Sequence, residues 1–110
     1  MNYTPDRWQV IKLTDTVNNK SHYRVFATWR GGYLNGDSWR MNSGIASVTF
    51  EDDYYNFVGS SGSIYCCHKG YYGSTIYGES VLQSISKSSD GKFTIDVMPE
   101  DTDFLKLEYK

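Results

Sequence analysis

The chain of 110 residues is long enough for one domain with a single hydrophobic core, whereas two domains of half this length would each bury too little apolar surface to be stable. Its formal net charge of -2 argues against a dedicated nucleic-acid-binding domain, because such domains are usually strongly basic. No apolar run approaches the roughly 20 residues that cross a bilayer, so we expect one domain over residues 1–110 without a membrane span.

The cysteines and the N-terminal segment indicate a reducing compartment. The only two cysteines, Cys66 and Cys67, are neighbours, and a disulfide between neighbours would close a strained ring. The first residues include the acidic Asp6 and lack an apolar segment followed by small residues, so they do not predict a secretory signal. We therefore expect a cytoplasmic protein that keeps both thiols reduced.

The first part of the chain predicts two strands. Strand-forming residues alternate over residues 8–14 and 22–30, and the polar residues 15–21 between them predict a turn. In the second strand, one alternate set is expected to face the core and the other to be largely exposed to solvent. The core set is Tyr23, Val25, Ala27 and Trp29, and the solvent-facing set is His22, Arg24, Phe26, Thr28 and Arg30.

Residues 31–44 are the main irregular segment, because they contain four glycines and few β-branched residues. Within them, the Asn35-Gly36 dipeptide favours a hairpin between Tyr33–Leu34 and residues 38–41. Trp39 is expected to begin a short edge strand there.

Residues 45–68 predict three consecutive strands at the centre of an antiparallel sheet. Strand formers alternate with polar turns at residues 51–53 and 59–62, which is the pattern of a meander. Because side chains alternate along a strand, one of Cys66 and Cys67 is expected to face the core.

After this meander, the periodicity of the sequence changes from two to helical. A helix is predicted over residues 75–88, with Ser74 or Thr75 as its N-cap, and a strand follows over residues 92–98. A proline ends that strand, and residues 104–109 are expected to add a short strand at the sheet edge. Together these elements predict an α+β domain, with an antiparallel sheet of about six to eight strands, a β-meander at its core and the helix packed on one face.

Four stretches of the chain carry a resemblance to known proteins: SWRMNSGI, YYNFVGSSGSIYCCHKGYYG, YGESVLQSI and VMPEDTD. In these stretches, and over nearly its whole length, the chain resembles small accessory proteins of the tailed phages that infect marine cyanobacteria. The resemblance implies a viral protein made in the cytosol of a bacterial host. It assigns no catalytic or binding residue.

The most reactive cluster of the chain is Cys66, Cys67 and His68. A thiol beside an imidazole can form a nucleophile and base pair, but Cys66 and His68 are two residues apart on a strand, or about 7 Å. The same cluster, with His22 as a fourth residue, lacks the separated ligand pairs of a tetrahedral zinc site. Two acidic runs are expected to be solvated turns instead of cation sites. The sequence therefore predicts no catalytic residue, no metal site and no cofactor.

Arginine and aromatic residues gather in and around the irregular segment. These residue types are favoured at the cores of protein interfaces, so our first hypothesis is a non-enzymatic binding module that engages a host or viral protein. The expected partner-binding residues are Arg30, Tyr33, Trp39 and Arg40. An alternative is single-stranded nucleic-acid binding through an arginine and aromatic sheet face, which the negative net charge disfavours. That face would consist of Arg24, Phe26, Trp29, Arg30, Tyr33, Trp39 and Arg40.

The Tyr72–Thr75 turn before the helix indicates a second alternative. Backbone N–H groups at a helix N-terminus attract anions, so Gly73, Ser74 and Thr75 are candidate binding residues for a small anionic ligand or nucleotide. No phosphate-loop lysine follows in register, and helix capping is the simpler role for the same residues. A second copy of the chain is a further candidate partner, because an unpaired edge strand can pair with the same edge of another copy.

Overall fold

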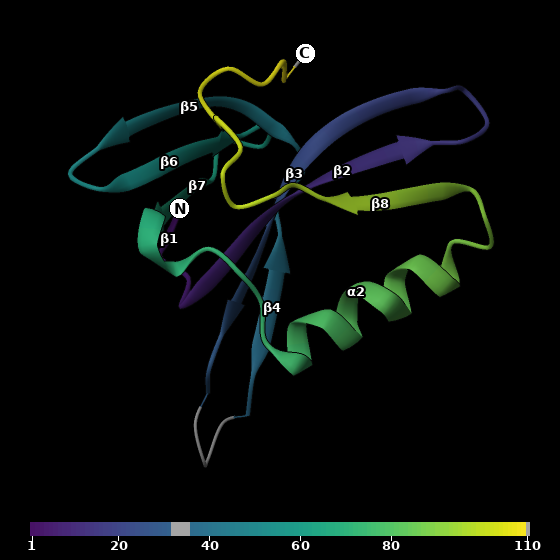
Figure 1. Cartoon of the computed structure of the whole chain (residues 1–110), viewed down its shortest axis with the longest axis horizontal. Coiled ribbons are helices and arrows are strands. Elements are labelled where there is room, and N and C mark those ends of the chain that lie inside the picture. The colour runs from purple at the N-terminus through teal and green to yellow at the C-terminus, as the bar shows by residue number, and fades with distance from the viewer. Residues whose placement is uncertain (32–35, 110) are drawn as a thin grey trace.

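The computed structural model describes residues 1–31 and 36–109, and over these residues it has eight strands and one α-helix (Figure 1). The predicted α+β class is therefore confirmed. The strands lie in two four-stranded sheets instead of the single sheet that we expected. We call them the hairpin sheet and the meander sheet.

The hairpin sheet contains, in spatial order, β4 (Ser38–Met41), β3 (Lys20–Trp29), β2 (Arg7–Asp15) and β8 (Phe93–Val97). All neighbouring strands in it are antiparallel, and the strands predicted for these segments are confirmed. Strand β4 pairs with β3. The predicted pairing of β4 with Tyr33–Leu34 falls on residues outside the described part of the chain.

The meander sheet contains, in spatial order, β1 (Asn2–Tyr3), β7 (Ile64–His68), β6 (Tyr54–Gly59) and β5 (Ile45–Glu51). The three strands predicted over residues 45–68 form the expected antiparallel meander, and β1 pairs with β7 in parallel. The meander therefore belongs to a sheet of its own and is not the centre of one large sheet.

The two sheets share a core that is built around Trp8 of β2. Trp8 is 1% exposed, and its ring lies 5.5 Å from Phe57 and 5.4 Å from Phe104, measured between ring centroids. Its indole N–H donates a hydrogen bond of 2.7 Å to the His68 carbonyl, so the one polar atom of this side chain has a partner. The same core includes Val10, Val25, Ala27, Ile45, Tyr65 and Cys67.

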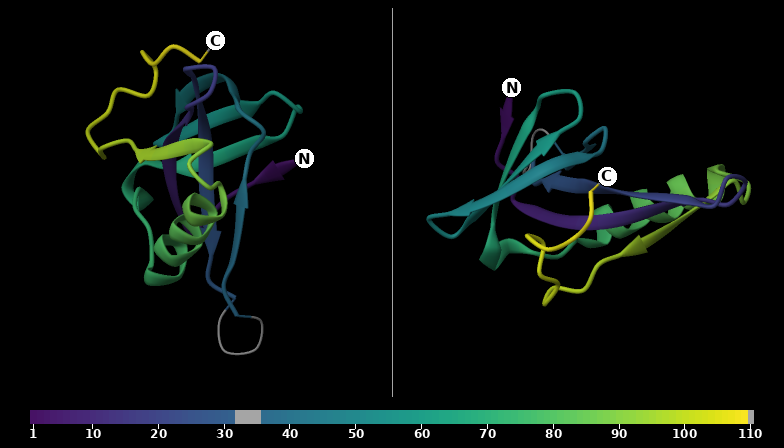
Figure 2. Two further views of the ribbon diagram at one scale, coloured as in Figure 1. Left: turned by 90° about the vertical axis from the view of Figure 1, so that its right-hand side faces the viewer. Right: turned by 90° about the horizontal axis from the view of Figure 1, so that it is seen from above.

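The helix α2 (Ile76–Ser88) covers the opposite face of the hairpin sheet (Figure 2). Its Leu82 packs in a second cluster with Phe26, which is 1% exposed, and Thr28 on the same strand face is 4% exposed. The prediction that this face of β3 is largely exposed is therefore wrong for Phe26 and Thr28. The physical reason is that α2 packs over this face of the sheet and removes both side chains from water.

Gly78 allows the first turn of α2 to pack close to the hairpin sheet. A Cβ atom at this position would lie 3.2 Å from Thr28 Cγ2 and 3.4 Å from the Phe26 ring, which leaves no free space for a side chain. The Gly78 amide donates a hydrogen bond of 3.1 Å to Thr75 Oγ1, which confirms Thr75 as the N-cap. Close packing thus offsets the roughly 1 kcal/mol that glycine costs in helix propensity relative to alanine.

After β8 the chain crosses the core without forming a further strand, so the strand predicted over residues 104–109 is wrong. The Lys106 amide donates a hydrogen bond of 3.0 Å to the Asp103 carbonyl, which turns the chain, and the Tyr109 hydroxyl donates to the Phe104 carbonyl. Phe104 is 2% exposed and belongs to the core that the two sheets share. This segment therefore contributes a buried ring to the core and no strand to a sheet.

Candidate functional site

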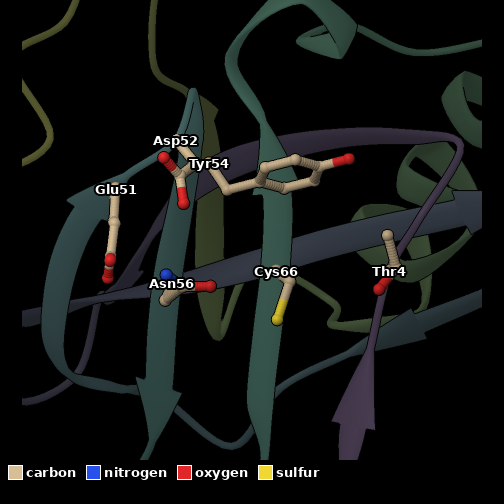
Figure 3. A pocket seen from close by; sticks show the side chains of 6 residues that line it. All are labelled: Thr4, Glu51, Asp52, Tyr54, Asn56 and Cys66. Atoms are coloured by element: carbon tan, nitrogen blue, oxygen red, sulfur yellow. The ribbon is translucent and has the colours of Figure 1, made fainter.

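Cys66 and Cys67 point to opposite faces of β7, as the alternation predicts. Cys67 is buried in the core, and burial raises the pKa of its thiol well above the usual value. Cys66 lies on the outer face of the meander sheet beside Asn56, in a polar hollow of about 500 Å³ that also includes Thr4 and Glu51 (Figure 3). The two free thiols therefore differ in their access to solvent although they are neighbours in the chain.

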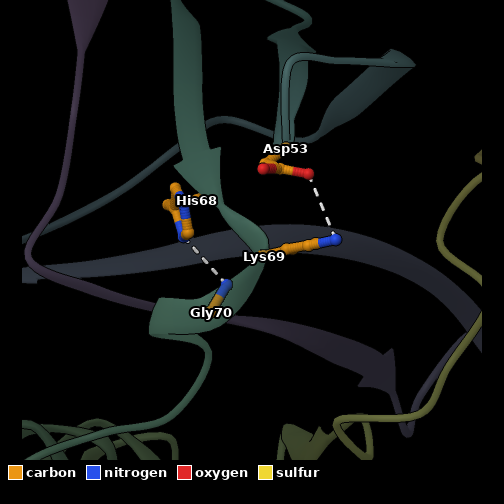
Figure 4. Close-up of polar contacts among 4 residues, drawn as sticks. All are labelled: Asp53, His68, Lys69 and Gly70. Carbon is orange, nitrogen blue, oxygen red and sulfur yellow. Dashed lines mark hydrogen bonds and ion pairs between the residues drawn. The ribbon is translucent and has the colours of Figure 1, made fainter.

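The imidazole of His68 is engaged away from these thiols. Its Nδ1 accepts a hydrogen bond of 3.0 Å from the Gly70 amide (Figure 4), and its ring lies 4.5 Å from the Tyr71 ring between centroids. In the part of the chain that the structure describes, no hydrogen bond joins His68 to Cys66. The cluster thus lacks the contact that a nucleophile and base pair requires.

We expect the two thiols to differ sharply in their reaction with an alkylating reagent at neutral pH. Cys67 should react slowly in the native protein, because it is buried and its raised pKa leaves little thiolate. Mass spectrometry should find at most one label on the native protein and two on the denatured protein. The Cys66→Ser variant, which removes the accessible thiol, should show no native label. Rapid double labelling of the native protein would contradict the buried position of Cys67.

The acidic turns form surface ion pairs. Asp53 pairs with Lys69 at 3.1 Å (Figure 4), and Asp103 pairs with Lys106 at 3.8 Å. Among residues 1–31 and 36–109, no three His, Cys, Asp or Glu side chains come together as metal ligands. Because both pairs are exposed, they contribute little to stability.

The predicted partner-binding residues do not form one surface. Trp39 and Arg40 are neighbours on β4 and therefore point to opposite faces of the hairpin sheet. The Trp39 ring packs beside Phe26 on the helix side, at 5.8 Å between centroids, whereas the Arg40 guanidinium lies 4.6 Å from the centroid of the Tyr3 ring on the other side. Tyr33 lies outside the described residues. Arg40 and Trp39 therefore cannot belong to the same binding surface on this sheet.

The proposed nucleic-acid platform is limited by the burial of its rings. Phe26 is buried, and Trp29 is half-buried with its indole N–H bound to the Thr4 carbonyl at 3.0 Å. Stacking of successive bases requires several exposed rings, but Trp39 is the one exposed ring among the described members of this set. The described residues of this set therefore do not present such a platform.

Arg30 lies in a hollow at the start of α2. The hollow has a volume of about 540 Å³ and is lined by Arg7, Arg30, Ser74 and Thr75, among others. Two separate predictions, partner binding at Arg30 and anion binding at Ser74 and Thr75, thus meet at one place. The sequence interpretation missed Arg7. Because side chains alternate along a strand and Trp8 faces the shared core, Arg7 must point to the other face of the hairpin sheet, which α2 covers.

Gly73 contributes no free amide to this hollow. Its N–H donates a hydrogen bond of 2.9 Å to the Trp8 carbonyl, so this amide is not available as a donor to an anion. The Thr75 hydroxyl is engaged as the helix cap. Of the predicted anion-binding residues, Ser74 and Thr75 remain as part of the lining.

A second cleft, which the sequence interpretation missed, lies at the other end of α2. Its volume is about 550 Å³. Ile85 of α2, Leu13 of β2 and Met41 of β4 supply apolar walls, and His22 and Arg24 of β3 supply a polar edge. The sequence feature that could have indicated this cleft is the alternation along β3, which places His22 and Arg24 on the same face as Phe26.

Strand β5 lies at an edge of the meander sheet, with β6 as its neighbour on one side. Its seven residues, Ile45–Glu51, include a single charged residue at the end of the strand. Such an edge is able to pair with another strand, so pairing with a second copy of the chain stays a prediction.

Comparison with known proteins yields no matching family model, no matching curated protein and no matching solved structure. Among the residues that the structure describes, no helix combines the length and the apolar character needed to cross a bilayer. Function must therefore be inferred from the geometry of the chain itself.

Proposed function

We propose that the protein is a non-enzymatic binding module that engages a host or viral protein through the surface at the start of α2. This docking surface consists of Arg7, Arg30, Trp39, Ile76 and Tyr77. The observation that supports the proposal is that Arg30 and the start of the helix, which the sequence indicated as separate sites, line one hollow near exposed apolar side chains.

The register of the hairpin sheet places Arg7 and Trp39 on the same face of the sheet, on either side of Thr28, which the start of α2 buries. Arg7 of β2 is paired with Thr28 of β3, and Thr28 is paired with Trp39 of β4, so the three residues form one row on the helix side. Because neighbouring strands are about 4.8 Å apart, the backbones at Arg7 and Trp39 are separated by roughly 10 Å. A partner that contacts both residues must therefore pack around the first turn of α2.

Apolar side chains of this surface are exposed to solvent. Ile76 is 89% exposed and Trp39 is 41% exposed. Tryptophan, tyrosine and arginine are the residues that most often dominate the binding energy of a protein interface. Covering the Trp39 ring would remove apolar area from water, which drives association.

The arginines of this surface favour an acidic partner. Among the described residues, neither Arg7 nor Arg30 forms an ion pair with a carboxylate. Asp37 also lines the hollow, so cationic groups outnumber acidic ones by two to one. The Arg30 amide donates a hydrogen bond of 2.8 Å to Asp6, which holds the backbone of this residue in place. The partner should therefore present a carboxylate or a phosphorylated side chain beside an apolar one.

We expect a Trp39→Ala, Arg30→Ala double variant to lose the protein that the wild type retains in stoichiometric amount from a bacterial lysate. The variant removes an apolar anchor and a cation together, so affinity for the purified partner should fall at least about a hundredfold by calorimetric titration. Arg40→Ala is the matched control, because it removes the arginine next to Trp39 from the opposite face of the sheet. Retention of every partner by the double variant would rule the docking surface out.

A small anionic ligand or nucleotide is the second candidate for this hollow, because Ser74 and Thr75 lie there with two arginines. A melting screen with phosphate and common nucleotides distinguishes the two candidates. A ligand at 100 times its dissociation constant adds about 2.7 kcal/mol of stability to the wild type, and Arg7→Gln should abolish this gain. Such a gain, combined with no effect of Trp39→Ala on any partner, would assign the hollow to a small anion and overturn protein docking.

A further inference from the structure

The cleft at the far end of α2 has an apolar floor. Its walls include Leu13 of β2, Met41 of β4, Ile85 of α2 and Phe93 of β8. Helix α2 packs on the sheet through the buried Leu82, whereas Ile85, one turn later, is only half-buried at the cleft. The volume of about 550 Å³ falls in the range of roughly 300–1,000 Å³ that small-molecule sites occupy. The floor is therefore suited to the apolar part of a small ligand.

Two cations lie at the rim of this cleft. They are Arg24 of β3 and Lys92, directly before β8, and neither forms an ion pair within residues 1–31 and 36–109. Asp15 also lines the cleft, but its two carboxylate oxygens accept hydrogen bonds of 2.9 Å from the Val17 amide and from the Asn18 side chain. The bonds from Asn18 and Val17 lower the pKa of Asp15 and hold it in the hairpin turn. The carboxylate is thus ionised but engaged in the turn, so the two cations outnumber the one anion of the lining and give the rim a net positive charge.

His22 orients the guanidinium of Arg24 toward this role. The Arg24 Nε–H donates a hydrogen bond of 2.8 Å to His22 Nε2. His22 accepts this bond only as the neutral imidazole, and burial together with the charge of Arg24 lowers its pKa, which favours the neutral form. The bond uses the Nε–H donor and leaves the terminal nitrogens of Arg24, which together can bind two oxygens of one anion.

We propose that this cleft binds an amphipathic anion, a small molecule with an aliphatic or aromatic body and one carboxylate, sulfonate, sulfate or phosphate head. The body lies on the apolar floor, and the head binds Arg24 and Lys92 at the rim. Charge complementarity selects this class, because the two cations outnumber the one carboxylate of the lining, so the rim attracts an anionic head and repels a cationic one. The cleft and the docking surface lie at opposite ends of α2, so the two proposals stand independently.

A pair of fluorescent probes tests the proposal on the intact chain. 1-Anilinonaphthalene-8-sulfonate and N-phenyl-1-naphthylamine share an aromatic body and differ in the sulfonate. The sulfonate probe should bind at one saturable site, about tenfold tighter than the neutral probe. Arg24→Met keeps the aliphatic part of the side chain and should reduce this preference, with Lys92 as the remaining cation, without weakening the neutral probe. The matched control, Lys87→Met, removes an exposed cation from the last turn of the same helix and should retain the preference.

A cleft-filling variant tests the location of the site. Ile85→Trp should weaken both probes about tenfold or more, while near-ultraviolet circular dichroism shows that the variant is folded. If Ile85→Trp does not fold, Met41→Trp fills the same space from β4. Unchanged binding in a folded cleft-filling variant would overturn the cleft as the site. Equal affinity for the two probes, unchanged sulfonate affinity in Arg24→Met, or no saturable binding to the wild type would overturn the anionic ligand.

Discussion

The Trp8→Ala variant should lose about 3–5 kcal/mol of unfolding free energy. Trp8 is 1% exposed, its ring packs against four other aromatic rings, and its N–H is bound by the His68 carbonyl. Truncation removes these contacts, leaves a cavity between two sheets that cannot close fully, and leaves a carbonyl without its donor. Because a domain of this size has about 5–15 kcal/mol in total, the variant should be marginally stable.

Urea denaturation followed by far-ultraviolet circular dichroism measures this loss. Trp39→Ala is the matched control, because it makes the same substitution at a residue that is 41% exposed, and it should lose clearly less stability than Trp8→Ala. Trp8→Phe keeps an aromatic ring but lacks the N–H donor, so its midpoint should lie between the two. Equal midpoints for Trp8→Ala and Trp39→Ala would contradict the central position of Trp8 in the core.

Phe104→Ala should cost a similar amount, about 3–5 kcal/mol, although the residue lies outside any helix or strand. Phe104 is 2% exposed, and its ring lies 5.4 Å from Trp8 and 5.5 Å from Tyr55 between centroids. Loss of this ring should also loosen the segment after β8, because it removes the fully buried anchor and leaves the half-buried Leu107 and Tyr109 to hold the segment on the core. Urea denaturation measures the stability, and amide hydrogen exchange measures the release of the segment.

The neighbouring Leu105→Ala is the matched control for this prediction. Leu105 is 52% exposed, so its truncation should change stability by less than about 1 kcal/mol. The Trp8→Ala, Phe104→Ala double variant should lose about 0.5–3 kcal/mol less than the sum of the single losses, because the two rings contact each other. If Phe104→Ala unfolded at the same urea concentration as Leu105→Ala, the segment would not be anchored as the structure indicates.

Local patterns were sufficient to predict most of the secondary structure. Alternation of period two indicated β2, β3 and β8, and a helical stripe with a capping residue indicated α2, because these patterns involve only residues that are close in the chain. The cap at Thr75 is local in the same sense, since its hydroxyl binds an amide three residues later. The opposite orientation of Cys66 and Cys67 is also local, because neighbouring side chains alternate along one strand.

Packing between distant segments required the tertiary structure. Residues 104–109 have a composition that suits a strand, but burial of the Phe104 ring between two sheets determines their conformation instead. Phe26 was expected to face solvent and is buried by α2, a helix encoded far downstream. The division of the strands into two sheets could not be predicted from the sequence either. Alternation along a strand shows that one face is apolar, but it does not show which element covers that face.

The candidate sites depend on tertiary structure for the same reason. The types of residue along the chain were sufficient to predict Arg30, Trp39 and Ser74 as candidate binding residues. It also paired Trp39 with Arg40, which alternation along β4 places on opposite faces. Arg7 reaches the start of α2, and Arg24 reaches Ile85, only after apolar faces of the sheet and helix have packed together. A binding site needs side chains from several elements at one place, and burial of apolar surface by the whole chain decides which elements meet.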